Sequence, residues 1–147
     1  FLESNNSVGV KDSEMTAMTV LRHSGIVFAF NSEIWNKFKL GELVSFNDNK
    51  TGKPALRNTV YEPQKGDLPL PPIQGIKDLQ ARGSLFCVCD LATKVYGSAV
   101  AKKMNLDPDD VYSDMVKGIL PGIQLVPSGV MALGRAQNNK CAYIFAG

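Results

Sequence analysis

The chain is poor in the residues that usually identify a catalytic or metal centre. Its 147 residues include one histidine, three cysteines and one tryptophan. A metal site would need more histidines, or a second ligand pair beside Cys87 and Cys89, so the spacing of these two cysteines is a weak zinc signal. There is also no P-loop, no GxGxxG after a strand and no nucleophile-elbow serine motif. We therefore expect neither a metal nor a cofactor.

Long apolar runs and runs of like charge are missing as well. No stretch approaches the roughly 20 apolar residues that span a bilayer, and no signal-peptide pattern opens the chain at Phe1. The 16 basic and 14 acidic side chains are interspersed and leave a net charge of +2. The missing apolar run predicts no membrane span. The balanced, interspersed charges predict no nucleic-acid partner. Any targeting signal would have to precede Phe1.

The composition is that of one compact domain over residues 1–147. Hydrophobic residues make up 44% and charged residues 20% of the chain, which is ordinary for a soluble globular protein. Short apolar segments rich in β-branched and aromatic residues are predicted as strands. These predicted strands cover residues 16–22, 84–89, 123–126 and 141–145.

Helices are predicted between these strands. The apolar run 26–30 is ambiguous between strand and helix, and we favour a helix. Ser32 is the expected N-cap of a helix through Phe38, and Asp107 followed by Pro108 is a strong helix start. The remaining predicted helices cover residues 73–82, 91–104 and 129 to 138 or 139, and the helix that begins at Pro108 ends near Gly118.

One long segment, Ser45 to Pro72, shows no periodicity and is rich in polar residues, glycine and proline. A loop of this length is uncommon inside a compact domain, so it indicates a lid, an oligomer contact arm or a flexible excursion. Because ordering each backbone residue costs about 1 to 2 kcal/mol, we expect the loop to be buried against a neighbouring subunit, where it completes or shields a cleft. This argument predicts a homo-oligomer.

The alternation of strands and helices predicts an α/β fold with a mostly parallel sheet covered on both faces. The carboxyl ends of parallel strands share one edge of the sheet, where ligands bind in open α/β folds. Chemically capable residues follow three of the predicted strands. They are His23 with Ser24 and Gly25, Cys89 with Asp90, and Ser128 with Gly129.

Cys89 is the most informative of these residues. It ends an apolar run and precedes Asp90, which we interpret as the N-cap of a helix that starts near Leu91. A thiol at such a junction faces backbone N–H groups and the positive end of a helix dipole, which favours the thiolate. We expect Cys89 to be alkylated faster than Cys87 or Cys141, which lie inside predicted strands. The alternative is that Cys89 is a small buried hydrophobe.

Four segments carry a resemblance to a known family: Leu21–Asn31, Trp35–Glu42, Cys89–Ala92 and, most specifically, Ile119–Val130. They resemble the DsrE/DsrF-like (DsrEFH-like) family, above all a subgroup of uncharacterised members that are often exported with a twin-arginine signal. The resemblance covers nearly the whole chain and implies a three-layer α/β/α sandwich, homo-oligomers and a persulfide on the cysteine at the position of Cys89. It also implies that a strand and part of a helix precede Phe1. A periplasmic or otherwise exported location follows from it, with a cytoplasmic one as the alternative.

Two functional hypotheses from different classes remain open. In the first, Cys89 is a persulfide carrier or thiol-based sulfurtransferase, with His23 or the nearby helix N-terminus stabilising the charged sulfur and Ser128 at the cleft rim. Its partners would be thiols and sulfane-sulfur donors. In the second, the same edge is a non-enzymatic module for ligand binding or assembly, and Cys89 is dispensable.

Overall fold

A sheet of three parallel strands organises the chain. In the computed structural model, which describes residues 1–70 and 73–145, the strands are β1 (Met18–Leu21), β2 (Leu85–Cys89) and β3 (Ile123–Val126). They are ordered β1-β2-β3, and both pairings are parallel. The expectation of a parallel sheet in an α/β fold is confirmed, and all three strands end at the same edge.

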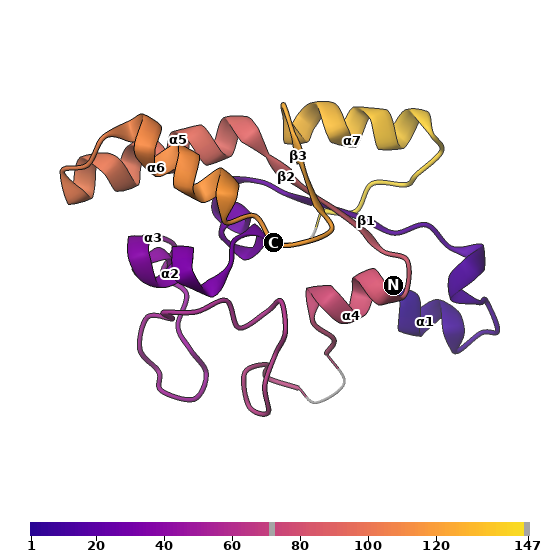
Figure 1. Ribbon diagram of the computed structural model, residues 1–147. Helices are drawn as coiled ribbons and strands as arrows, with labels where there is room; N and C mark the ends of the chain where they lie inside the picture. The colour runs from indigo at the N-terminus through magenta and orange to yellow at the C-terminus, as the bar shows by residue number, and fades with distance from the viewer. Residues whose placement is uncertain (71–72, 146–147) are drawn as a thin grey trace.

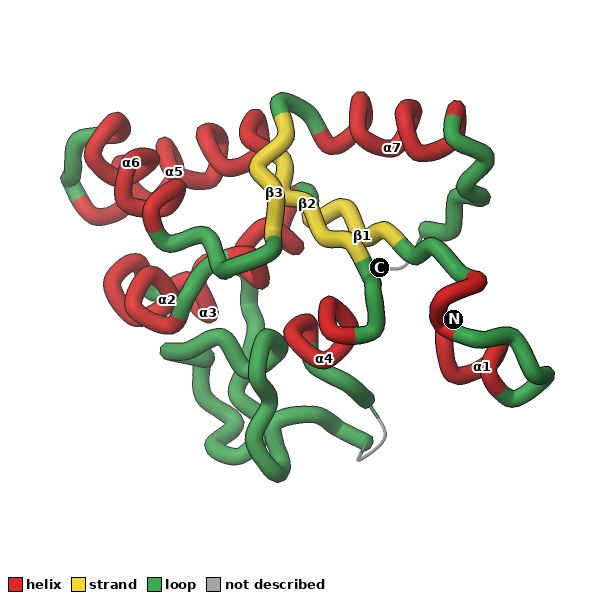
Figure 2. Tube along the Cα trace, turned by 45° about the vertical axis from the view of Figure 1, so that its right-hand side comes forward, coloured by secondary structure: helices red, strands yellow, loops and turns green. Residues whose placement is uncertain are grey.

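Helices lie on both sides of this sheet (Figure 1, Figure 2). In Figure 1, α7 lies above the strands and α2, α3 and α4 lie below them, while α5 and α6 lie at the upper left and pack with α2 into the main core. The α-helices are α1 (Leu2–Asn6), α2 (Ser32–Phe38), α3 (Leu40–Leu43), α4 (Ile76–Ala81), α5 (Asp90–Met104), α6 (Pro108–Lys117) and α7 (Gly129–Asn138), and the 3-10 helices are η1 (Asp12–Glu14) and η2 (His23–Ala29).

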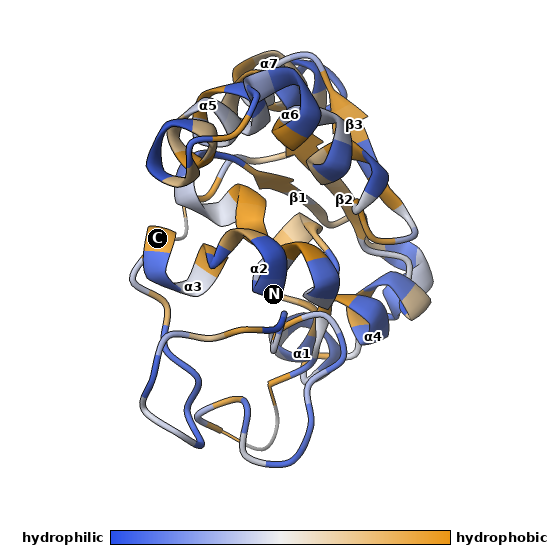
Figure 3. Ribbon diagram, turned by 60° about the vertical axis from the view of Figure 1, so that its left-hand side comes forward, coloured by the Kyte–Doolittle hydropathy of each residue, from blue (hydrophilic) through white to orange (hydrophobic). Residues whose placement is uncertain are grey.

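The two faces of β2 have different surroundings. Phe86 and Val88 belong to the main hydrophobic core, which also holds the fully buried Trp35. Because side chains alternate along a strand, Cys87 and Cys89 point to the other face, where α7 packs against β1 and β2. In Figure 3 the strands are coloured mostly hydrophobic and lie between α7 and the helices α2, α3 and α4. The cysteines of β2 therefore lie beneath α7, outside the main core.

Local sequence signals explain where α6 begins and ends. The Asp107 carboxylate accepts hydrogen bonds from the backbone N–H groups of Asp109 and Asp110, with Pro108 in the first turn. Helix α6 then ends at Gly118. These boundaries confirm the predicted start and stop, because capping satisfies backbone donors that the helix itself leaves free.

Two expectations for the first half of the chain have different outcomes. The run 26–30 is helical as favoured, although as part of the 3-10 helix η2, which ends at Ala29. Ser32 is not the cap of α2: the side-chain amide oxygen Oδ1 of Asn31 accepts from the backbone N–H of Ile34 at 3.0 Å. The Ser32 hydroxyl instead accepts a hydrogen bond from the N–H of Asn58. Asparagine caps helices as well as serine does, and here the long loop engages the serine.

The predicted fourth strand is wrong. Residues 141–145 form neither a strand nor a helix, and Ile144 and Phe145 are about three-quarters exposed, at 75% and 74%. Apolar, β-branched and aromatic composition favours a strand only where a partner edge supplies hydrogen bonds and packing. Within the described residues of one chain, this segment pairs with no strand.

The described part of the loop, residues 45–70, lies at the bottom of Figure 2, on the far side of α2 and α3 from α7. Its residues up to Leu70 contain no helix or strand beyond one isolated bridge, as expected, while residues 71 and 72 lie outside the described part. The loop is anchored within its own chain, because the Asn58 amide donates to the carbonyl oxygens of Phe28 and Phe30 at 2.9 Å. These bonds tie the loop to η2 of the same chain, and its burial against a neighbouring subunit stays a prediction.

No helix among residues 1–70 and 73–145 is both long enough and apolar enough to cross a membrane.

Candidate functional site: a pocket around Cys89

Cys89 is both the last residue of β2 and the N-cap of α5. Its sulfur accepts a hydrogen bond from the backbone N–H of Ala92, with 3.4 Å between Sγ and N. The Thr93 hydroxyl donates to the Cys89 carbonyl oxygen and ties the same turn together. The strand thus passes directly into the helix, and the thiol lies where unpaired N–H groups carry the positive end of the helix dipole.

Asp90 is therefore not the cap, contrary to the sequence-based expectation. Its carboxylate accepts from the Tyr112 hydroxyl at 2.6 Å and from Lys94 at 2.7 Å, which joins α5 to α6. Burial raises the pKa of Asp90, but the hydrogen bonds from Lys94 and Tyr112 outweigh it and leave the pKa lowered. The carboxylate is engaged with these two partners and does not line the pocket beside Cys89.

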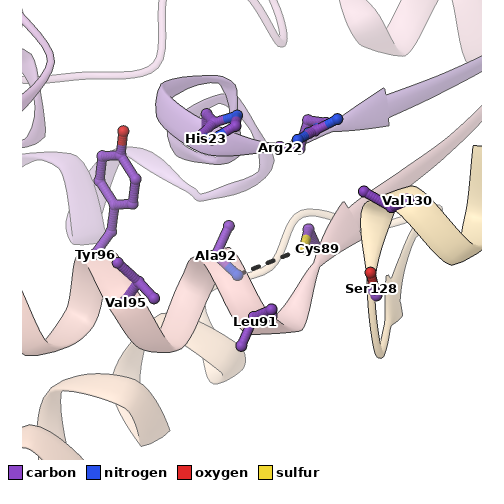
Figure 4. A pocket seen from close by; sticks show the side chains of 9 residues that line it. All are labelled: Arg22, His23, Cys89, Leu91, Ala92, Val95, Tyr96, Ser128 and Val130. Atoms are coloured by element: carbon purple, nitrogen blue, oxygen red, sulfur yellow. Dashed lines mark hydrogen bonds between the residues drawn. The ribbon is translucent and has the colours of Figure 1, made fainter.

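A pocket of about 210 Å³ opens over the carboxyl edge of the sheet. We call it the Cys89 pocket. Figure 4 shows that its walls come from the ends of all three strands and the helices that follow them. It is lined by Arg22, His23, Cys89, Leu91, Ala92, Val95, Tyr96, Ser128 and Val130. The predicted gathering of His23, Cys89 and Ser128 at one edge is confirmed, whereas their roles stay predictions.

The three cysteines have distinct environments, and none is in a disulfide. Cys87 and Cys89 are 3% and 6% exposed, but of the two only Cys89 lines the pocket. Burial, together with the neighbouring Cys89, raises the pKa of the Cys87 thiol. Cys141 is only partly buried and lies in no strand, so the reason for expecting it to react slowly is wrong.

Gly129 lets the start of α7 approach the site closely. A Cβ atom at this position would lie 3.2 Å from Val20 Cγ1, 3.3 Å from Arg22 Cβ and 3.4 Å from Cys89 Cβ. The residue is buried, while Ser128, the N-cap of α7, makes no capping hydrogen bond with its side chain. The absence of a side chain at Gly129 thus allows α7 to form one wall of the pocket.

The first strand contributes the positive side of the pocket. His23 has a left-handed backbone conformation, with φ +47°, which turns the chain sharply from β1 into η2. Such a conformation is uncommon for a residue other than glycine and often occurs at functional turns. Ser24 and Gly25 lie in the same turn but outside the pocket lining. Among the described residues, no hydrogen bond or ion pair engages the side chain of Arg22 or His23.

Sequence reasoning missed Arg22 and most of the apolar wall. Leu91 and Val95, and likewise Ala92 and Tyr96, are four residues apart on α5, so each pair shares one helix face. Leu91, Val95 and Val130 are 60%, 59% and 62% exposed. A usable signal was the pair of apolar residues four apart, Leu91 and Val95, that follows Cys89, but that spacing normally indicates core packing.

No group of three or more histidine, cysteine, aspartate and glutamate side chains in the described part of the chain could hold a metal ion. No family model matches the chain, and comparison with curated proteins and with solved structures yields no significant match.

Proposed function

We propose that this protein is a persulfide carrier or thiol-based sulfurtransferase in which Cys89 holds the transferred sulfur. The observation that carries the proposal is the Cys89 sulfur at a helix N-cap, bonded to the Ala92 N–H and lining an open pocket. A buried cysteine with a purely structural role, such as Cys87 in its strand, needs neither feature.

The chemistry requires a thiolate that can be reached by a sulfur donor. The Cys89 thiolate would attack a sulfane sulfur, and the bond between that sulfur and the rest of the donor would break, leaving Cys89–S–S⁻ and the donor's leaving group. A second thiolate would then take the outer sulfur and regenerate Cys89. An N–H donor and a helix dipole stabilise negative charge on sulfur in both the thiolate and the persulfide.

The resemblance to the DsrE/DsrF-like family supports the same proposal, because its characterised members carry sulfur on a cysteine after a central strand. In this chain that position is Cys89, at the end of the middle strand β2. The three-layer arrangement, the homo-oligomer and export from the cytoplasm belong to the same proposal.

Intact-mass spectrometry after exposure to inorganic polysulfide tests this function. The native protein should gain one sulfur atom on Cys89, and a reducing thiol should remove it. Cys89→Ser should lose the modification and Cys141→Ser, which changes a more accessible thiol outside the pocket, should retain it. Modification that follows Cys141 instead of Cys89 would contradict the proposal.

A second candidate function rests on the exposed apolar wall. Leu91, Val95 and Val130 are each more than half exposed around the pocket, and such clustered apolar surface often marks a site that binds a ligand or another protein. In that case the edge of the sheet is a binding or assembly module and Cys89 is dispensable. Cys89→Ser would then preserve every measurable binding property of the protein.

A further inference from the structure

We propose, resting on the sulfur-transfer function above, that the Cys89 pocket takes sulfur from small organic donors that combine an anionic sulfur group with an apolar body. Aryl thiosulfonates, Ar–SO₂–S⁻, are the model class. Inorganic thiosulfate, which has the same kind of sulfane sulfur but no apolar part, would be a poor donor.

The charge of the pocket favours an anion. The cation Arg22 lines it just after β1, with His23 beside it, and Cys89 lies at the N-terminus of α5. Among residues 1–70 and 73–145, no carboxylate lines the pocket, and the nearest one along the chain from Cys89, Asp90, is bonded to Lys94 and Tyr112. By contrast, Arg57 and Arg82 elsewhere in the fold are paired with carboxylates. Arg22 is thus available to an anionic ligand.

The walls favour an apolar body. Five of the nine lining residues have an aliphatic or aromatic side chain: Leu91, Ala92, Val95, Tyr96 and Val130. A small, fully hydrated anion such as thiosulfate gains nothing from these side chains and loses water on approaching them. An aromatic or alkyl group attached to the same anionic sulfur would instead cover apolar surface that is exposed in the free protein.

The size of the pocket limits the donor to a small molecule. The volume of the Cys89 pocket is about 210 Å³. This is below the range of about 300 to 1,000 Å³ found for typical ligand pockets. A single ring or short alkyl chain with one acidic group fits these limits better than a nucleotide or a folded protein loop.

The reaction balances without an oxidant or reductant. The Cys89 thiolate attacks the terminal sulfur of Ar–SO₂–S⁻, and a new S–S bond forms. The bond between the two donor sulfurs breaks, its electron pair leaves with the sulfinate Ar–SO₂⁻, and Cys89–S–S⁻ remains. One negative charge is present on each partner before and after transfer, so Arg22 can hold the donor and then the sulfinate.

The test compares the rates at which benzenethiosulfonate, methanethiosulfonate anion and thiosulfate form the Cys89 persulfide, measured by intact mass. Each rate is divided by that of the same donor with free N-acetylcysteine, which removes differences in intrinsic reactivity. We expect the phenyl donor to exceed the methyl donor by at least about tenfold after this correction, since pocket contacts of this size discriminate to that extent. Thiosulfate should be slowest.

Two sets of variants measure separately how the apolar wall and the charge of Arg22 contribute to the choice of donor. The double variant Leu91→Ser/Val95→Ser changes two exposed side chains and should abolish most of the phenyl preference, whereas Val8→Ser, an exposed valine outside the pocket, should not. Arg22→Gln should slow the anionic donors more than it slows labelling of Cys89 by neutral iodoacetamide. The matched control is Arg135→Gln, which removes an exposed arginine outside the pocket lining.

Equal corrected rates for the three donors, with a persulfide still formed on Cys89, would overturn this substrate class and leave the proposed function standing. Failure of every donor to modify Cys89 would overturn both. An equal loss with iodoacetamide and anionic donors in Arg22→Gln would show that Arg22 acts on the thiol and not on the donor, which would overturn the anion-binding part.

Discussion

The buried carboxylate of Asp67 offers a sharp test of how the long loop is held. Its side chain is fully buried, and Oδ1 lies 2.5 Å from Arg57 Nη2 and 2.9 Å from Lys50 Nζ. Oδ2 accepts a hydrogen bond from the N–H of Gln64 at 2.7 Å. Asp67→Asn keeps the shape of the side chain but removes the charge that both cations face.

The expected loss in the free energy of unfolding follows from the bonds that Asp67→Asn removes. Asparagine can still accept from the Gln64 N–H, so the loss is confined to the charge-assisted contacts with Arg57 and Lys50. Hydrogen bonds to charged groups contribute about 1.5 to 3 kcal/mol each, and breaking a fully buried ion pair costs about 3 to 5 kcal/mol. The two cationic side chains are 30% and 36% exposed, so they regain water when the pair is lost. We expect the free energy of unfolding to fall by about 2 kcal/mol.

Urea unfolding followed by the fluorescence of Trp35, the single tryptophan, measures this change. With a dependence of about 2 kcal/mol per molar urea, the midpoint should fall by about 1 M. The control is Asp114→Asn, which removes the partner of Lys37 in a largely exposed ion pair and should shift the midpoint little. A shift for Asp67→Asn no larger than that of the control would refute the reasoning.

The pH dependence of stability independently tests whether the ionised form of Asp67 stabilises the fold. Burial raises the pKa of Asp67, but hydrogen bonds from Arg57, Gln64 and Lys50 outweigh it and hold the pKa well below its usual range. A carboxyl group whose pKa is lower in the folded than in the unfolded state stabilises the fold above the unfolded value, about 4. The stability difference between native protein and variant should therefore be full at pH 6 to 7 and shrink as the pH falls below about 4. A difference that grows on acidification would contradict this assignment.

Three further predictions concern the site, a helix and the assembly. In native protein near neutral pH, iodoacetamide should label Cys89 faster than Cys87, because burial raises the pKa of Cys87; peptide mapping that finds the reverse order would count against an accessible Cys89. Asp107→Ala should lower the free energy of unfolding by about 0.5 to 2 kcal/mol in urea titration, whereas Asp109→Ala, which accepts no capping bond, should have a smaller effect. Because the proposal includes a homo-oligomer, light scattering at micromolar concentration should give a mass above that of the 16.0 kDa chain, and a monomer mass would contradict this part of the proposal.

Local signals made some elements of this fold predictable. The Asp107–Pro108 pair marks the start of α6, and the apolar run before Cys89 marks β2, because capping and strand composition act over a few residues. Capping signals were ambiguous where two neighbouring residues could each be the N-cap of the same helix. Asn31 rather than Ser32 caps α2, since the loop residue Asn58 engages the serine from far away in sequence.

Part of the candidate site was also predictable, because its residues directly follow apolar runs that form strands. The positions of His23, Cys89 and Ser128 after apolar runs, combined with parallel pairing, brought them to one edge. Nothing local distinguished Arg22 as a lining residue or Asp90 as a residue turned toward Tyr112. Those orientations depend on how α6 packs against α5 and how closely α7 approaches at Gly129.

The sequence by itself determined the α/β alternation, the helix boundaries set by Asp107 and Gly118, and the placement of a thiol at a strand-to-helix junction, because each depends on neighbouring residues. Only the tertiary structure decided that Cys89 caps its own helix and that an apolar pocket with Arg22 surrounds it. It also decided that residues 141–145 remain without a strand partner. The physical reason is that a side chain's partners and a strand's neighbours come from distant parts of the chain, which local composition does not specify.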